Sequence, residues 1–132
     1  MNRLIAVRLH RGDDLLKEIR RLAAEHNISC GAVISAVGCV SCARVRDAGG
    51  VNIRSIDCGC EIVSLTGTIS NVRNHLHIAL AKEDLTVVGG HLVEGCIINT
   101  TCELIILSSS EYRIVVEEDE STGYDEAVFV SD

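Results

Sequence analysis

Residues 61–81 read EIVSLTGTISNVRNHLHIALA, two runs rich in β-branched residues and leucine with a short polar interruption between them. We predict strands over Glu61–Ser70 and Asn74–Ala81, joined by the turn Asn71-Val72-Arg73. Two strands that are joined by such a short connection run antiparallel to each other. This stretch therefore decides the fold class, because it places an antiparallel sheet in the middle of the chain.

The same strand pattern continues on both sides of this pair. Short glycine- and serine-rich turns at residues 48–50 and 108–110 separate the runs, which favours meanders and hairpins over parallel βαβ units. The acidic run Glu117–Glu120 is interpreted as a solvated loop. The apolar stretch Ala127–Val130 is expected to form a short edge strand or to pack on a neighbouring subunit. The further predicted strands are Leu4–His10, Val37–Arg46, Val51–Ile56, Cys96–Leu107 and Glu111–Val116.

One amphipathic helix is predicted after the first strand. Apolar residues at 15, 16, 19, 22 and 23 recur with helical spacing, Asp13-Asp14 suit a helix N-terminus, and Asn27 is a plausible stop. For the small apolar segment Ile28–Ala36 we favour a short helix over a buried strand. The predicted fold is thus α+β, a single domain of residues 1–132 with a largely antiparallel β-sheet flanked by one long and one or more short helices.

Composition restricts the class of protein. The chain has 132 residues, enough for one domain, and its aromatic content is only 2%, so Val, Ile, Leu and Ala must build the core. The 19 acidic residues outnumber the 12 basic ones, giving a net charge of −7, which argues against direct binding to nucleic acid or to an anionic membrane. The chain contains no window of about eighteen apolar residues, the length that could span a membrane. The charges near its N-terminus do not fit a signal sequence. We expect a cytoplasmic protein.

Three histidines form the most informative chemical pattern. His75 and His77 are two residues apart in a predicted strand, so their side chains share one face. His91 follows Gly89-Gly90, a pair that we interpret as a backbone turn able to bring a third imidazole close. Three imidazoles around an open position suit zinc or a similar divalent metal. The alternative is that all three are ordinary polar strand and turn residues. We expect His10 to be a surface residue, and His26 to cap carbonyls at the end of the helix or to be exposed.

The seven cysteines are numerous for a chain without an export signal. Cys39-x-x-Cys42 and Cys58-Gly59-Cys60 could be paired thiolate ligands. Residues three apart in a strand point to opposite faces, however, which argues against the first pair. We favour scattered thiols that behave as small apolar residues in a reducing compartment.

Three segments carry a family resemblance by their order and spacing: EIVSLTG at 61–67, HLHIAL at 75–80 and VGGHL at 88–92. They resemble the PPC domain, the plants-and-prokaryotes domain that occurs alone in bacteria and archaea and behind AT-hooks in plant nuclear proteins. The resemblance extends over nearly the whole chain, taking in residues 8–16, ISAVG at 34–38 and TTCE at 100–103. It identifies residues 1–132 as a PPC domain, and it implies an antiparallel sheet flanked by helices and assembly as a homotrimer.

The resemblance also bears on nucleic acid binding. Stand-alone members are commonly labelled DNA-binding by analogy with plant proteins, in which an Arg-Gly-Arg AT-hook reaches the minor groove. This chain has no such element. Where the plant proteins carry a Gly-Arg-Phe-Glu-Ile-Leu partner-recruiting motif, residues 58–63 read CGCEIV, without the arginine and phenylalanine. Direct DNA binding and that partner contact are therefore not expected here.

A more distant resemblance links the fold to acetolactate decarboxylase, a zinc lyase whose metal is held by a His-x-His pair and a later histidine. It implies a metal that acts as a Lewis acid, an arginine that anchors a substrate carboxylate and a carboxylate that moves a proton. Candidates by residue type alone are Arg8, Arg73, Glu61, Glu94 and Glu103.

Two hypotheses from different classes follow. The first is a homotrimeric binding or regulatory module with a divalent metal at His75, His77 and His91, and with a possible small-molecule ligand. The second is a metal-dependent lyase or hydrolase acting on a small carboxylate-bearing substrate in the same pocket. We favour the module, because no catalytic residue can be assigned from the sequence.

Overall fold

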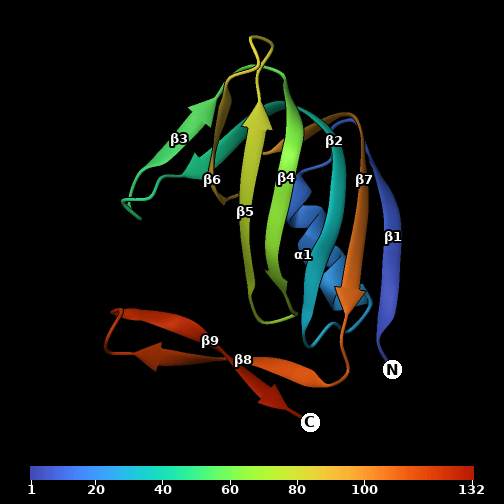
Figure 1. The fold of residues 1–132 in the computed structure, drawn as a ribbon, viewed down its shortest axis with the longest axis vertical. Coiled ribbons are helices and arrows are strands. Elements are labelled where there is room, and N and C mark those ends of the chain that lie inside the picture. The colour runs from blue at the N-terminus through green and yellow to red at the C-terminus, as the bar shows by residue number, and fades with distance from the viewer.

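The computed structural model describes residues 1–132 as nine strands and a single helix (Figure 1). The predicted antiparallel sheet is confirmed, but one helix is present where one long and further short ones were expected. In chain order the elements are β1 (Arg3–His10), α1 (Leu15–Glu25), β2 (Gly31–Arg46), β3 (Ile53–Ile56), β4 (Cys60–Ile69), β5 (Asn74–Ala81), β6 (Val87–Leu92), β7 (Ile97–Ser108), β8 (Tyr112–Asp119) and β9 (Tyr124–Ser131).

The main sheet has the strand order β1-β7-β2-β4-β5-β6, with β3 added beside β2. Helix α1 lies against one face of this sheet (Figure 1). The apolar stripe predicted for the helix is buried in full, and it forms one cluster with inward-facing residues of the strands. Alternate residues of β1 behave likewise, since Ile5 and Leu9 are buried while Leu4 is 66% exposed. The core is therefore the layer between helix and sheet.

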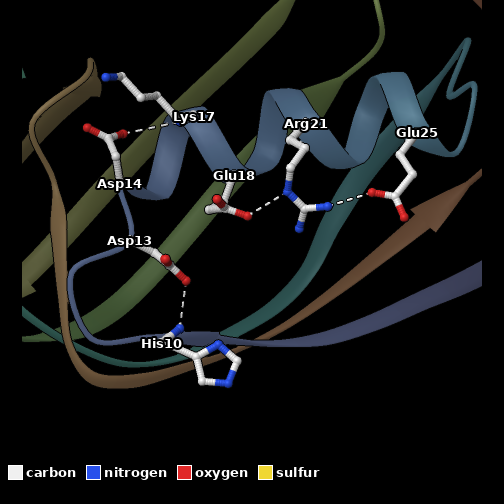
Figure 2. Close-up of polar contacts among 7 residues, drawn as sticks. All are labelled: His10, Asp13, Asp14, Lys17, Glu18, Arg21 and Glu25. Atoms are coloured by element: carbon white, nitrogen blue, oxygen red, sulfur yellow. Dashed lines mark hydrogen bonds and ion pairs between the residues drawn. The ribbon is translucent and has the colours of Figure 1, made fainter.

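The ends of α1 follow from local chemistry. Asp14 caps the N-terminus, because its carboxylate accepts from the backbone N–H of Lys17 at 3.2 Å and from that of Gly95 at 2.8 Å. Figure 2 shows this cap and the exposed Arg21, which pairs with a glutamate on each side. Asn27 adopts a left-handed conformation with φ of 50° just beyond the helix, which confirms it as the stop.

The short helix predicted for Ile28–Ala36 is wrong. Strand β2 begins at Gly31, which pairs with Ile69 on one side and Ser108 on the other. A Cβ atom at Gly31 would lie only 2.7 Å from the carbonyl oxygen of Leu107, so the glycine lets the neighbouring strand approach. Pairing along both edges decides the conformation here, and it outweighs the weak local preference of small apolar residues.

The pair Gly89-Gly90 does not form the turn predicted for it. Both residues lie in β6, which pairs with β5 and also with the end of β2, so β2, β4, β5 and β6 form a closed ring of pairings. A Cβ atom at Gly90 would lie 2.6 Å from the carbonyl oxygen of Arg46, and one at Gly89 would lie 2.1 Å from that of Ile78. The glycines are needed because β6 packs closely between two strands.

The C-terminal residues form a separate hairpin of β8 and β9 below the main sheet (Figure 1). The acidic run predicted as a loop instead continues β8 as far as Asp119, although Glu117 and Glu118 remain exposed. The edge strand expected at Ala127–Val130 is longer and begins at Tyr124. The hairpin is attached through buried Ile114, whose backbone N–H donates to the carbonyl oxygen of Ser29 at 2.9 Å.

Candidate metal centre

The three histidines predicted from the sequence come together on one face of the sheet. His75 and His77 occupy alternate positions of β5, and His91 of β6 stands directly opposite His77 in the antiparallel register. Their ring centroids are 5.1 to 5.6 Å apart. On the other side of β5, Gly67 of β4 pairs with Leu76. Gly67 has a φ of +146°, and a Cβ atom added to it would lie 1.9 Å from the carbonyl oxygen of His75.

The histidine nitrogens fit a metal ion in number and chemistry, and they lie close together. One nitrogen from each ring lies within 4.8 Å of the others. In a tetrahedral zinc site with bonds of 2.0–2.1 Å, such nitrogens are about 3.3 Å apart. To bind one ion, the side chains would have to turn so that these nitrogens approach one another more closely. No other group of three or more residues in the chain brings metal-ligating side chains together in this way.

The environment favours the neutral form of His75 and His91, and it leaves one nitrogen of His91 unpartnered. Burial, followed by the nearby guanidinium of Arg46, lowers the pKa of His91 to about 4. Burial also lowers the pKa of His75, with His77 and Arg73 adding to the effect. The Nδ1 atom of His91 is buried and has no hydrogen-bond partner in the protein. A neutral imidazole with a free nitrogen is the form that binds metals.

A cavity of about 480 Å³ opens beside the cluster. Its walls are the loop after β2, the start of β5, His91 and the start of β9. Arg46 lies next to His91 because the two are paired across β2 and β6. Sequence reasoning missed Arg46, since nothing local distinguishes the last residue of a predicted strand, and the pairing that brings it here spans 45 residues of chain (91 − 46).

Of the five charged candidates named for catalysis, only Arg73 reaches this cavity. Arg8 of β1 pairs with Glu103 of β7, at the edge of the sheet opposite to β5 and β6. Glu94 is exposed and pairs with Arg20 at 2.5 Å. Glu61 is exposed and lines a different hollow, together with Cys39 and Cys60. The structure thus gives these four residues no place in the site.

The cysteines are all free thiols. Cys60, Cys96 and Cys102 are buried, and burial raises the pKa of Cys96 and of Cys102 to about 11. These thiols are protonated at neutral pH and behave as apolar core residues, as expected. Cys58 is exposed, and the remaining three are partly buried. The pairs Cys39/Cys42 and Cys58/Cys60 do not meet a third potential ligand.

His10 is exposed, as predicted for a surface residue, and His26 is the C-cap residue of α1. The carbonyl oxygen of His26 accepts from the guanidinium of Arg3. Neither histidine approaches the cluster on β5 and β6. The one helix of the protein, α1, is too short and too polar to cross a lipid bilayer.

Comparisons with known proteins agree with this architecture. Two relatives, each named bifunctional protein GlmU and each from a Synechococcus strain, are 37% and 38% identical over 122 residues, which is 92% of this chain. The chain spans about a fifth of their length, 19% and 20%.

Two solved structures are also similar. A hypothetical protein from Salmonella matches with a TM-score of 0.96 and 26% identity, over 99% of this chain and 95% of that one. The metal-containing protein AF0104 from Archaeoglobus fulgidus matches with a TM-score of 0.79 and 27% identity, over 96% of this chain and 93% of that one.

A family model supplies the assignment. The Plants and Prokaryotes Conserved domain, abbreviated PCC and the same family as the PPC domain named above, matches residues 1–110. This range contains the main sheet, the helix and all three histidines, and it ends before the β8–β9 hairpin. The chain therefore belongs to the Plants and Prokaryotes Conserved (PCC) domain family.

Proposed function

We propose that this protein is a binding module that holds one divalent metal ion, zinc or a similar ion, through His75, His77 and His91. The observation that carries the proposal is the cross-strand pair His77–His91, with His75 on the same face and one nitrogen from each ring within 4.8 Å of the others. The metal content of the Archaeoglobus fulgidus relative supports it.

The ligand set favours a transition metal over magnesium or calcium. Three neutral imidazoles suit zinc, whereas magnesium and calcium prefer oxygen ligands. With three protein ligands, a zinc ion would keep a fourth position open and could act there as a Lewis acid. The protein's own part is to hold the rings rigidly, because all three stand on paired strands and not on loops.

We propose that the module works as a homotrimer. Large apolar side chains are exposed on three strands of the main sheet: Leu4 on β1, Ile34 and Val37 on β2, and Val63 on β4. Exposed apolar surface of this kind is typical of protein interfaces. Sedimentation equilibrium should give a mass of three 14.2 kDa chains; the mass of a monomer would contradict the proposal.

The alternative function is a metal-dependent lyase or hydrolase. The cavity beside the histidines, with Arg46 and Arg73 in its wall, is the observation that favours it. Direct DNA binding is less favoured, because the net charge of −7 opposes a phosphate backbone. We expect the protein to work in the cytoplasm, where a reducing environment keeps its seven cysteines as thiols.

Elemental analysis tests the metal proposal. Untagged protein supplied with zinc should carry about one ion per chain, and the double variant His75→Ala/His77→Ala should carry none. The matched control is His10→Ala/His26→Ala, which also removes two imidazoles but leaves the cluster intact. If the wild type stays free of metal, or if both double variants lose zinc equally, the proposal is wrong.

A further inference from the structure

Two cysteines that the proposed metal site does not use lie together at one end of the main sheet. Cys58 and Cys60 flank Gly59 in the segment that leads into β4. Cys58 and Lys82 line one hollow, and Cys60 and Lys82 line the adjoining one. Figure 1 shows this end of the sheet at the top, where β5 ends and β4 begins. The pair therefore lies at the surface, beside the residues that follow β5.

The backbone and the side chains of this pair fit a disulfide bond. Residues two apart in an extended chain have Cα atoms about 6.6 Å apart, within the range of about 4.4–6.8 Å that disulfides require. The chain bends at Cys58, which shortens this span. The side chain of Cys60 turns back toward Cys58, since its Sγ atom lies 3.6 Å from the carbonyl oxygen of Cys58. Little movement is needed to bring the two sulfur atoms together.

The two thiols differ in their exposure, which gives them different parts in an oxidation. Cys58 is exposed and meets any oxidant dissolved in the solvent, whereas Cys60 is buried. Burial, followed by the neighbouring Cys58, raises the pKa of Cys60, so this thiol stays protonated at neutral pH. An accessible thiol next to a second thiol that resolves its oxidised form is typical of redox-sensing sites.

Cys39 is the alternative partner for Cys60, because both line the same hollow. The sulfur atom of Cys39 lies 3.1 Å from Oγ1 of Thr100 and 3.7 Å from the carbonyl oxygen of Asn99, and both of these residues belong to β7. Strand β2 separates β7 from β4. The thiol of Cys39 is therefore held on the side of β2 away from β4, while that of Cys60 turns toward Cys58.

We propose that Cys58 and Cys60 are a redox-sensing pair that forms a reversible disulfide with a hydroperoxide as the oxidant. With hydrogen peroxide, the sulfur of Cys58 attacks one oxygen, the O–O bond breaks, and a sulfenic acid forms as the first water leaves with the proton of Cys58. The sulfur of Cys60 then attacks that of Cys58, the S–O bond breaks, and the second water leaves with the proton of Cys60. Two thiols are oxidised, and one peroxide is reduced to two waters. Transient disulfides of this kind occur in reducing compartments, and a dithiol reverses them.

Peptide mapping of the full chain tests the proposal. Cleavage by trypsin after arginine releases residues 55–73 as one peptide, whose only cysteines are Cys58 and Cys60. After the reduced protein has reacted with hydrogen peroxide and has been denatured and alkylated, this peptide should be lighter by two hydrogen atoms and should carry no alkyl group. The number of free thiols in the chain should fall from seven to five (7 − 2), and dithiothreitol should restore both.

The same digest contains an internal control. Residues 22–44 form a second peptide, with Cys30, Cys39 and Cys42, and each of these should still be alkylated. The proposal would be overturned if these cysteines were oxidised while the peptide 55–73 remained alkylated at both positions. A disulfide that joins the two peptides would also overturn it, because Cys39 or one of its neighbours would then be the partner.

Variants then assign the two roles. Cys58→Ser changes an exposed side chain and should fold normally, and its Cys60 should stay reduced and be alkylated after the peroxide treatment, because that thiol is buried and protonated. The matched control is Cys39→Ser, which should form the disulfide as fully as the wild type does. Oxidation of Cys60 in Cys58→Ser to the same extent as in the wild type, or loss of the disulfide in a folded Cys39→Ser protein, would contradict the assignment.

Discussion

Substitution of Gly90 by alanine should disrupt the metal centre without touching a metal ligand. The new Cβ atom would lie 2.6 Å from the carbonyl oxygen of Arg46, whereas ordinary contact begins at 3.4 Å. Strands β2 and β6 must therefore separate by 0.8 Å (3.4 − 2.6). His91 is the next residue along β6 and moves with it. This shift adds to the side-chain movement that the three rings already need in order to reach one ion, so zinc binding should weaken.

We expect Gly90→Ala to weaken zinc binding about 10–100-fold, similar to the loss of a group that orients a ligand. Overpacking should also lower the free energy of unfolding by about 1–3 kcal/mol. Competition with a chromogenic chelator measures the affinity, and urea denaturation measures the stability. The control is Gly59→Ala, whose Cβ atom would meet nothing nearer than 3.7 Å. If a folded Gly90→Ala protein binds zinc as tightly as Gly59→Ala does, the reasoning is refuted.

Three further predictions concern the stability of the protein. Because the pKa of His91 is lowered to about 4, the unfolded chain binds a proton between pH 6.5 and 4 that the folded chain does not. The free energy of unfolding of the metal-free protein should therefore fall by about 1–2 kcal/mol as pH falls through this window, after allowance for partial solvent exposure. In His91→Gln the free energy of unfolding should depend less steeply on pH, and an equally steep dependence in the variant would contradict this. Zinc at a hundredfold excess over its Kd should stabilise the wild type by about 2.7 kcal/mol in thermal melts. No such gain is expected in His75→Ala/His77→Ala, and a similar gain there would place the metal elsewhere. Asp14→Ala should cost about 1–2 kcal/mol in urea denaturation, since it removes the helix cap and leaves the N–H of Gly95 without its partner; a change below about 0.3 kcal/mol would disprove the role of the cap.

The histidine cluster could be predicted because its geometry is mostly local. His75 and His77 share a face through the two-residue period of a strand, which the sequence shows directly. The position of His91 was predicted for the wrong reason. It reaches the cluster through the register of β5 and β6, and not through a turn at Gly89-Gly90. A glycine pair has the same sequence signature whether the backbone turns or a neighbouring strand approaches closely.

Segments whose conformation depends on distant partners could not be predicted. The residues Gly31–Ala36 join β2 because β7 pairs along this segment and β4 pairs with its first two residues, and neither pairing is visible locally. The acidic end of β8 has low strand propensity, yet it pairs with β9 along its length. Local patterns predict a strand best where its own apolar alternation is strong, as in β1 and β5.

The cavity lay beyond sequence reasoning for the same reason. Arg46 comes from the end of β2, Asn74 from the start of β5 and Glu126 from the C-terminal hairpin, so three distant segments meet there. Arg73 was named only by its residue type. Charge counts gave no indication of the site, because its arginines lie among acidic residues in a chain of net charge −7.

X-ray absorption spectroscopy of the zinc-loaded protein tests the central claim most directly, because it identifies the atoms bound to the metal. A site of three imidazoles predicts nitrogen neighbours at about 2.0–2.1 Å, with the outer-shell scattering of three histidine rings and no sulfur. Sulfur neighbours at about 2.3 Å would instead place the ion on the cysteines, and would contradict the assignment of His75, His77 and His91 as the metal centre.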